Sequence, residues 1–283
     1  MTADVRTAAA PLIRLALEED VGAGDITTEA CIPAGARGAA RIIARGPTVV
    51  CGLFLAEQIY SALSDEVTCR AQVGEGTRVY TGRELLRLEG PLGVLLTGER
   101  VTLNFLGRLC GIAANVRRFR RRAGDGVALL DTRKTTPGWR VLERYAVRIG
   151  GGVNHRTGLY DQFLIKENHI AGAGGIVNAI RRARDHAGDR PIQVEVRNRE
   201  ELVLAVESGV DSILLDNMTP PQIREMVRLV GGRCVLEASG GINHRNLAAY
   251  AATGVTRISV GALTHSAPNA DLSMLVMRDG SRA

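Results

Sequence analysis

Two lysines are the first side chains in this sequence that suggest chemistry. Lys134 and Lys166 are the only lysines among 36 basic residues, so arginine stands at every other basic position. A lysine ammonium is a compact charge on a flexible stem, whereas the arginine guanidinium is a planar fork. We therefore expect the two lysines where a movable ammonium is needed, against phosphate groups or against charge that develops during a reaction.

Further cationic residues accompany the lysines along the chain. Arg133 precedes Lys134, and the pair His155 and Arg156 lies between the two lysines. Arginine forks suit planar carboxylates, while lysine suits phosphates. The formal net charge of +6 would also draw anions towards such a group. These five residues together predict a site for a planar, acidic substrate.

Acidic and glycine-rich positions complete the candidate site. Glu195 and Asp216 suit Mg²⁺ or sugar hydroxyls, although either acid alone could equally be a buried ion-pair partner. Small residues whose backbone N–H groups could bind phosphate follow later in the chain: Ser239, Gly240, Gly241 and Gly261. The combined set predicts a pocket for an acidic ring, a metal ion and a sugar phosphate.

The elements that must position these residues begin near residue 126, where strand and helix patterns alternate. Most strand patterns are short apolar runs, as expected of parallel strands buried on both faces. They cover residues 127–131, 163–166, 192–196, 212–216, 234–239 and 257–261. Six such units predict a doubly wound sheet or a TIM-like barrel. The sequence contains neither GxGxxG nor GxxxxGK[ST], so a Rossmann or P-loop protein loses its main support.

The positions of the candidate residues favour the barrel. Each strand run ends in a polar or glycine-rich stretch on its carboxyl side, and the candidate residues lie in or close to these stretches. In a barrel the carboxyl ends of the strands converge on one mouth, where barrel enzymes carry their active sites. We therefore expect the candidate residues to meet at one mouth.

The first part of the chain has a different pattern. Helices are predicted over residues 9–19 and 53–63, the second among short strand-like runs between residues 37 and 90. A long helix is predicted over residues 93–122. It ends in a cluster of five arginines: Arg117, Arg118, Arg120, Arg121 and Arg122. Cations near the C-terminus of a helix complement the helix dipole, so the cluster is interpreted as a solvated helix end.

Composition excludes several classes of protein. With 283 residues, 45% apolar and 23% charged, the chain can form a substantial core, which excludes a disordered or fibrous protein. The five cysteines are scattered without a CxxC motif, which fits a reduced, cytoplasmic protein. No signal peptide or membrane span is recognisable, so we expect no membrane partner. A nucleic-acid binder is disfavoured because aromatic residues make up only 4% of the chain.

Long motifs in the sequence resemble those of the quinolinate phosphoribosyltransferase family. The clearest is DTRKTTPGWRVLERYAVRIGGGVNHRTGLYDQFLIKENHI at residues 131–170. The others occur in the expected order over nearly the whole chain: GDITTEACIP (24–33), LLTGERVTLNFLGRLCGIA (95–113), VEVRNREEL (194–202), ILLDNM (213–218), EASGGI (237–242) and ISVGALTHS (258–266). Long motifs of this kind are far more specific than any short pattern.

The resemblance implies a reaction and an architecture. Quinolinate and phosphoribosyl pyrophosphate would give nicotinate mononucleotide, pyrophosphate and CO₂ in de novo NAD biosynthesis, with Mg²⁺. The fold would be an N-terminal open-faced α/β sandwich, residues 1–113 joined by 267–283, and a partial, seven-stranded α/β barrel over residues 114–266. The protein would be at least a homodimer, in which the N-terminal domain of one subunit closes the barrel mouth of the other.

The resemblance also assigns roles to matched residues. The quinolinate-binding group would be Arg133, His155, Arg156 and Lys166, with Arg100 from the neighbouring subunit and with Lys134 and Thr135 in the same loop. Lys166, Glu195 and Asp216 would be the catalytic residues, and the two acids would face the ribose and its metal. Ser239, Gly240, Gly241 and Gly261 would hold the phosphates. Whether His155 acts in the chemistry or orients a carboxylate stays open.

Two related activities remain as alternatives. A phosphoribosyltransferase acting on nicotinate would hold one carboxylate, whereas the several cations of this sequence argue for the two carboxylates of quinolinate. A divergent relative could use the same pocket for another aromatic acid. Release of CO₂ and pyrophosphate from quinolinate would separate these activities from the main prediction.

Overall fold

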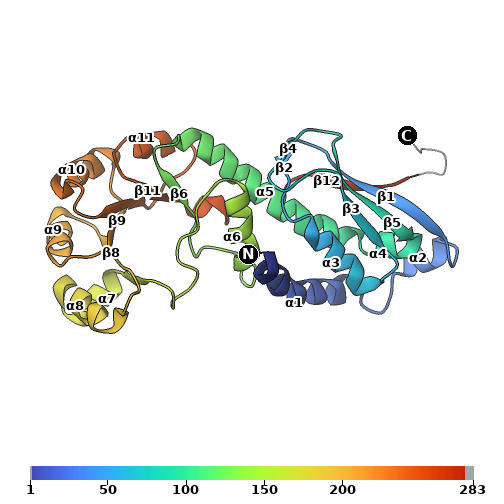
Figure 1. The fold of residues 1–283 in the computed structure, drawn as a ribbon, viewed down its shortest axis with the longest axis horizontal. Helices are drawn as coiled ribbons and strands as arrows, with labels where there is room; N and C mark the ends of the chain where they lie inside the picture. The colour runs from blue at the N-terminus through green and yellow to red at the C-terminus, as the bar shows by residue number, and fades with distance from the viewer. Residues whose placement is uncertain (1, 278–283) are drawn as a thin grey trace. The chain divides into compact units, whose positions relative to one another are not determined.

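The computed structural model describes residues 2–277, which form two units. The first unit contains residues 2–116, 136–151 and 267–277, and the second contains residues 117–135 and 152–266. The division falls within one helix, α5 (Glu99–Ala123), which is labelled in Figure 1. Each unit has its own sheet.

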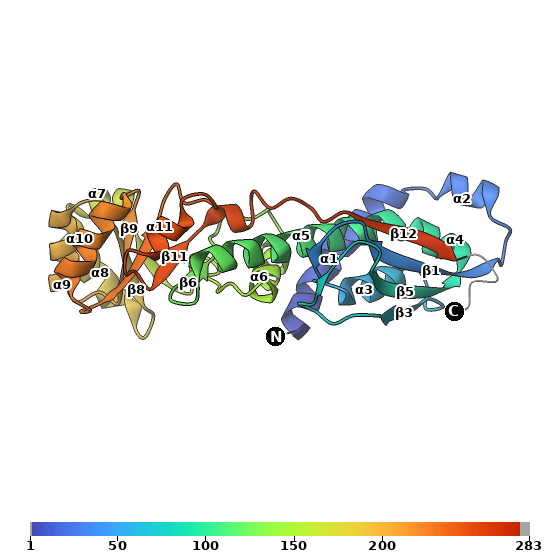
Figure 2. The same ribbon diagram turned by 90° about the horizontal axis from the view of Figure 1, so that it is seen from above.

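The sheet of the first unit has four antiparallel strands in the order β12-β1-β5-β3. These strands are β1 (Arg37–Ala44), β3 (Thr68–Ala71), β5 (Glu84–Pro91) and β12 (Leu272–Met277). β12 comes from the far end of the described chain and pairs along the edge of β1, as Figure 2 shows. A separate short pair is formed by β2 (Thr48–Val49) and β4 (Arg78–Val79). The segment 267–277 therefore belongs to the first unit, while residues 278–283 of the predicted segment lie outside the described residues.

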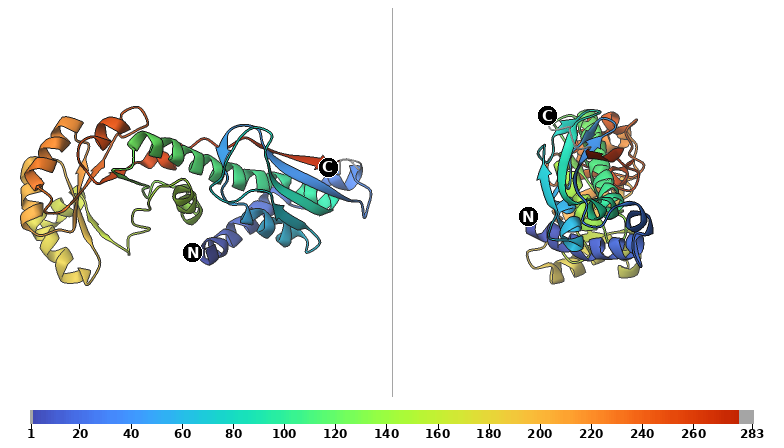
Figure 3. Two further views of the ribbon diagram at one scale, coloured as in Figure 1. Left: turned by 45° about the horizontal axis from the view of Figure 1, so that its top comes forward. Right: turned by 90° about the vertical axis from the view of Figure 1, so that its right-hand side faces the viewer.

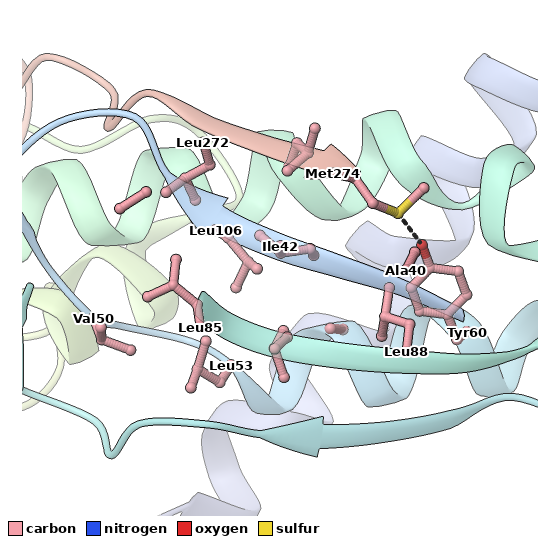
Figure 4. Close-up of a cluster of buried hydrophobic side chains, with 14 of the residues drawn as sticks. Ala40, Ile42, Val50, Leu53, Tyr60, Leu85, Leu88, Leu106, Leu272 and Met274 are labelled. Carbon is pink, nitrogen blue, oxygen red and sulfur yellow. Dashed lines mark hydrogen bonds between the residues drawn. The ribbon is translucent and has the colours of Figure 1, made fainter. Parts of the chain in front are cut away.

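The core of the first unit lies between this sheet and its helices, chiefly α3 (Phe54–Leu63), α4 (Leu92–Thr97) and the beginning of α5. Ala40 and Ile42 are fully buried on β1, whereas Arg41 between them is exposed, because successive residues of a strand face opposite sides. Figure 4 shows Ala40 and Ile42 with Tyr60, whose hydroxyl lies 3.6 Å from Met274 Sδ, the contact marked by the dashed line. The same hydroxyl donates a hydrogen bond to the Leu95 carbonyl at 3.0 Å. The phenol therefore lies in an apolar core without an unsatisfied polar group.

The second unit contains a parallel sheet of six strands in the order β6-β11-β10-β9-β8-β7. Its strands are β6 (Ala128–Leu130), β7 (Phe163–Ile165), β8 (Ile192–Val196), β9 (Ser212–Asp216), β10 (Val235–Ser239) and β11 (Arg257–Ser259). A single parallel bridge from Leu130 to Val153 stands beside β6, in the place of a seventh strand. The predicted six runs thus form the sheet of a partial barrel, and the seventh position is reduced to one bridging residue.

Helices connect successive strands of this sheet and lie on its outer side, as Figure 3 shows. They are α7 (Glu167–Ala173), α8 (Ile176–Ala187), α9 (Arg199–Glu207), α10 (Pro220–Val230) and α11 (Leu247–Ala251). Apolar residues of α8 and α10, such as Ile180 and Ile223, are buried, which is the amphipathic pattern of a helix on a sheet. None of the helices described between residues 2 and 277 has the length and apolar character needed to cross a membrane.

Two differences from the predicted elements have local causes. The helix predicted over residues 93–122 is interrupted at Gly98, which separates α4 from α5. A Cβ atom at position 98 would lie 2.5 Å from the Tyr60 ring, so only glycine fits at this corner. The turn-rich stretch after residue 21 contains a short helix, α2 (Ile26–Cys31), because Asp25 caps it by accepting a hydrogen bond from Thr28 N.

The division into units differs from the predicted domain boundaries at residues 136–151. This segment contains α6 (Arg140–Ile149), which falls within the predicted barrel domain of residues 114–266 but belongs to the first unit. Tyr145 of α6 packs edge to face on Phe54 with ring centroids 5.6 Å apart, and its hydroxyl bonds to Glu75 at 3.1 Å. The apolar face of α6 was visible in the sequence, but its partner was not.

Candidate functional site

A cavity of about 600 Å³ opens in the second unit at the carboxyl ends of the parallel strands. Eleven of the predicted site residues line it: Arg133, Lys134, His155, Arg156, Lys166, Glu195, Asp216, Ser239, Gly240, Gly241 and Gly261. They come from segments that follow or end six different strands, which is how a barrel mouth collects side chains. The structure therefore brings most of the predicted residues into one cavity.

Two predicted residues do not line this cavity. Thr135 is in the loop after β6, where its N–H donates to the Arg133 carbonyl at 3.0 Å. Arg100 belongs to the first unit, on the first turn of α5, and its side chain is exposed. Arg100 lines a cavity of about 460 Å³ in that unit, together with Asp25 and Thr97. Asp25 Oδ2 accepts a hydrogen bond from Thr97 Oγ1 at 3.1 Å, which ties α2 to the residue just before the Gly98 corner.

Eight residues of the cavity were given no role in the predicted site: Thr132, Leu164, Leu214, Asn217, Ile242, Ser259, Ala262 and His265. Thr132, Asn217 and Ala262 belong to the strand-end stretches that were expected to meet at the mouth, so the strand-end pattern placed them correctly. Asn217 carried a stronger signal, since an asparagine after the acid that ends a strand readily adopts left-handed backbone, and its φ is 55°. Ser259 gave no such signal, because it falls within the predicted strand run 257–261, although in the structure it is the last residue of β11.

Arg133 and Arg156 form the cationic part of the cavity. Burial lowers the pKa of the Arg156 guanidinium, and the charge of Arg133 lowers it further. Both guanidinium groups line the same cavity, so their positive charges repel each other. A ligand with two negative charges between them would remove this repulsion, and each planar fork could take one carboxylate in bidentate geometry.

Lys166 and Glu195 form an ion pair on neighbouring strands of the cavity. Lys166 Nζ lies 3.0 Å from Glu195 Oε2, and the lysine side chain is 49% exposed while the glutamate is 13% exposed. The backbone N–H of Lys166 donates to His169 Nδ1 at 2.9 Å, which fixes the start of α7. The ammonium is therefore held at the cavity by a carboxylate but remains accessible to a ligand.

The acidic and glycine-rich loops after β9 and β10 pack tightly together. Asn217 donates its backbone N–H to the Ser239 carbonyl at 2.9 Å and its amide to Asp216 Oδ2 at 2.6 Å. Gly240 has a φ of 92°, and a Cβ atom there would lie 2.2 Å from Asn217 Oδ1. Only glycine allows this approach, which leaves backbone at the cavity wall where a phosphate could bind.

A further loop contact joins the last strand to the lysine loop. Thr264 Oγ1 donates to the Lys134 carbonyl at 2.8 Å. A Cβ atom at Gly261 would lie 3.1 Å from Lys134 Cδ and 3.0 Å from His265 Nε2, so the lysine stem passes close to this glycine. The second lysine of the chain is thus placed beside the candidate phosphate loop.

The carboxylates of the cavity could supply only some of the ligands that a metal ion needs. Among residues 2–277, no group of three or more His, Cys, Asp or Glu side chains is arranged to hold a metal ion. Glu195 and Asp216 alone could supply one or two ligands. Such a partial set fits Mg²⁺, which is often held by one or two carboxylates together with substrate phosphates.

The segment that carries His155 and Arg156 is fixed by hydrogen bonds to a buried carboxylate. Asp131 is fully buried at the end of the strand run. Its carboxylate accepts hydrogen bonds from His155 N at 2.7 Å and from Asn154 Nδ2 at 2.6 Å. A carboxylate that accepts two such bonds fixes the course of the backbone before Arg156.

The parallel sheet, with a cavity at the carboxyl ends of its strands that arginine and lysine side chains line, defines a partial α/β barrel with a cavity suited to an anionic ligand. Residues 25–110 match the family described as quinolinate phosphoribosyl transferase, N-terminal domain, and residues 112–275 match the corresponding C-terminal domain. The chain belongs to the quinolinate phosphoribosyltransferase family.

Curated relatives and solved structures agree with this assignment. A probable nicotinate-nucleotide pyrophosphorylase [carboxylating] of Bacillus subtilis is 42% identical over 259 residues, covering 90% of this chain and 89% of the relative. The nicotinate-nucleotide pyrophosphorylase [carboxylating] of Mycobacterium leprae is 40% identical over 94% of this chain and 96% of its own. The solved structure of the nicotinate-nucleotide pyrophosphorylase from Francisella tularensis has a TM-score of 0.92 and 36% identity, covering 96% of both chains.

Proposed function

We propose that this protein transfers a phosphoribosyl group from phosphoribosyl pyrophosphate to quinolinate, with release of pyrophosphate and CO₂, to form nicotinate mononucleotide for NAD biosynthesis. The observation that carries the proposal is the grouping of Arg133, Arg156 and Lys166 at one cavity that also contains Glu195 and Asp216. The names of the Bacillus and Mycobacterium relatives support the same activity.

Quinolinate is the substrate that best matches the cations. It carries two adjacent carboxylates on a planar ring, so it can place one negative charge against each of Arg133 and Arg156. Burial lowers the pKa of Arg156, and the charge of Arg133 lowers it further; a bound dianion would counter both effects. Nicotinate, with one carboxylate, would balance only half of this charge.

Phosphoribosyl pyrophosphate fits the remaining wall of the cavity. Its phosphates would bind the backbone of Gly240, Gly241 and Gly261, with Lys134 as an adjacent cation. Glu195 and Asp216 would then face the ribose hydroxyls and hold Mg²⁺ jointly with the substrate phosphates. When bound, Mg²⁺ would neutralise the charge of the departing pyrophosphate.

The reaction needs no covalent intermediate with the protein. The ring nitrogen of quinolinate forms a bond to ribose C1 as the bond from C1 to pyrophosphate breaks, and pyrophosphate keeps the electron pair. Glu195 and Asp216 stabilise the positive charge that develops on the ribose. The ring nitrogen is then cationic, so the ring can accept the electron pair when CO₂ leaves and a proton replaces it. Lys166 is the ammonium held at the cavity to stabilise charge during these steps.

The proposed enzyme acts as at least a homodimer with a shared active site. Arg100 is exposed in the first unit and does not line the cavity of the second. An arginine supplied by a neighbouring subunit would add a third guanidinium to the quinolinate site. Mixing the Arg100→Ala and Lys166→Ala variants tests this arrangement.

The setting of the enzyme is proposed to be the cytoplasm, with no nucleic-acid or membrane partner. All five cysteines are free thiols, which supports a reducing compartment. In the arginine cluster, Arg120 Nη1 bonds to the Val127 carbonyl at 3.1 Å, and Arg118 lies over the Phe119 ring. These contacts support a structural role for the end of α5.

Product release from labelled quinolinate tests the proposed function. We expect equal amounts of CO₂ and pyrophosphate from quinolinate and phosphoribosyl pyrophosphate, and loss of both when Mg²⁺ is chelated. Nicotinate, assayed in parallel, should give no pyrophosphate. Pyrophosphate from nicotinate without CO₂ would overturn the substrate but keep the phosphate site, and no turnover with either acid would contradict the proposal.

A further inference from the structure

One buried carboxylate next to the candidate site has no part in the reaction proposed above. Glu237 lies in the middle of β10 with its side chain 1% exposed. It accepts hydrogen bonds from Gln193 Nε2 at 3.0 Å and from the hydroxyl of Ser259, and His155 Nε2 lies 3.3 Å from its Oε1. Two donors, the Gln193 amide and the Ser259 hydroxyl, thus face this carboxylate, as its unprotonated form, which only accepts hydrogen bonds, requires. Glu237 is therefore a buried anion.

The hydrogen bonds leading away from Glu237 have a fixed direction. Because Gln193 donates its amide NH₂ group to the carboxylate, its other amide atom, Oε1, is turned towards His155. The distance from His155 Nε2 to Gln193 Oε1 is 3.1 Å, and the Glu237 carboxylate lies nearby, so Nε2 faces two acceptors. An imidazole nitrogen that faces only acceptors carries the proton.

The other nitrogen of the ring faces a donor. The backbone N–H of Arg156 points at His155 Nδ1 at 2.7 Å, so Nδ1 must accept and cannot carry a proton. His155 is therefore the neutral tautomer with its proton on Nε2. Both ring nitrogens therefore have hydrogen-bond partners within the protein.

We propose that Glu237 is a positioning residue for the substrate: through Gln193 it fixes the tautomer of His155, whose ring then holds the Arg156 backbone and so places the Arg156 guanidinium. His155 accordingly acts as a support for Arg156, not as a ligand of the substrate carboxylate. The inference rests on the proposed function only for the identity of the anion that Arg156 binds.

The charge of Glu237 is needed for this role. A buried carboxylate costs desolvation that an uncharged side chain would avoid. A carboxylate, however, only accepts hydrogen bonds, so it forces the Gln193 amide into one orientation. A glutamine in its place could donate as well as accept, and the whole chain of bonds could then reverse. Reversal would place a proton on His155 Nδ1, directly against the N–H of Arg156.

Nuclear magnetic resonance of the full chain labelled with ¹⁵N-histidine tests the tautomer without any substrate. His155 signals can be assigned by their loss in His155→Asn, since the chain has five histidines. We expect Nε2 at the shift of a protonated nitrogen and Nδ1 at that of an unprotonated one. In Glu237→Gln the proton should move at least partly to Nδ1. A wild-type ring protonated on Nδ1, or an unchanged tautomer in folded Glu237→Gln, overturns the proposal.

Two substitutions of His155 distinguish a residue that supports Arg156 from a residue that binds the substrate. This comparison does not depend on whether the Glu237→Gln variant folds. Asparagine keeps an acceptor near the position of Nδ1, whereas glutamine keeps a polar group only near Nε2. We expect KM for quinolinate to rise about tenfold more in His155→Gln than in His155→Asn, as for loss of one hydrogen bond. KM for phosphoribosyl pyrophosphate should move little in either variant.

Addition of quinolinate to the labelled wild type supplies the opposing test. If the ring only supports Arg156, its two nitrogens keep their protonation states when quinolinate binds. A change of protonation at either nitrogen, or equal effects of the Asn and Gln variants, would show that the imidazole binds the substrate and would refute the supporting role. If quinolinate is not a substrate at all, the proposed function fails, while the tautomer measurements still decide the inference about Glu237.

Discussion

Replacement of Glu143 by glutamine should destabilise the first unit by about 3–5 kcal/mol, the range observed when one partner of a buried ion pair is removed. Glu143 is fully buried, and Arg108 contacts its Oε1 through Nη2 at 2.7 Å and Nε at 3.0 Å. The Thr136 hydroxyl donates to the same oxygen at 2.8 Å. Glutamine would lose the charge and would place an NH₂ group among these donors.

The single tryptophan of the chain is a natural probe for this experiment. Trp139 stacks on Phe105 with ring centroids 4.5 Å apart, and both residues belong to the same unit as Glu143. Its fluorescence during urea titration therefore reports the free energy of unfolding of this unit. The double variant Arg108→Met with Glu143→Met should recover much of the stability, because no unpaired charge is then left buried.

An exposed ion pair provides the matched control. Arg14 and Glu18 lie one helical turn apart at 3.3 Å, with side chains 75% and 60% exposed. Glu18→Gln should cost at most about 0.5 kcal/mol, as for other exposed helix pairs. If Glu143→Gln costs no more than this control, the reasoning from burial is wrong.

Three further predictions concern the candidate active site. Lys166→Ala should abolish most turnover while leaving the circular dichroism spectrum unchanged, and near wild-type turnover would contradict its role. Mixing Lys166→Ala with Arg100→Ala should restore activity if each site takes residues from two subunits; failure in verified mixed dimers would exclude sharing. Gly240→Ala should raise KM for phosphoribosyl pyrophosphate far more than Gly241→Ala. Both glycines have positive φ, of 92° and 61°, but only the first methyl group would collide with Asn217. Similar KM values in the two variants would argue against a close phosphate loop.

The parallel strands were predictable because a strand buried on both faces is a nearly continuous run of apolar residues, which is easy to recognise in the sequence. Each predicted run, such as 192–196 or 212–216, matches a strand to within two residues. Strand ends then identified most of the cavity, since parallel topology brings all carboxyl ends to one edge. The partner of α6 was not predictable, because an amphipathic pattern shows that a helix has a buried face but not what covers it.

The supporting residues of the site were missed for a related reason. Glu237 lies in one of the polar strand-end stretches predicted to meet at the mouth but was given no role of its own, and Gln193 was treated as part of its strand, although a polar residue inside a buried strand needs a partner. That rule predicts a buried network but not its members, because Glu237, Gln193 and His155 are brought together by three separate segments. Only the structure shows the direction of each hydrogen bond.

The position of β12 at the edge of β1 has a consequence for synthesis on the ribosome. β1 ends at Ala44, but its partner begins at Leu272, after the whole second unit. At typical rates of translation, the edge of β1 stays unpaired for on the order of 10 s, until β12 has been synthesised. An uncovered edge strand is a template for pairing with other chains. Nascent chains that stall before residue 272 should therefore be the forms most prone to aggregate and most dependent on chaperones.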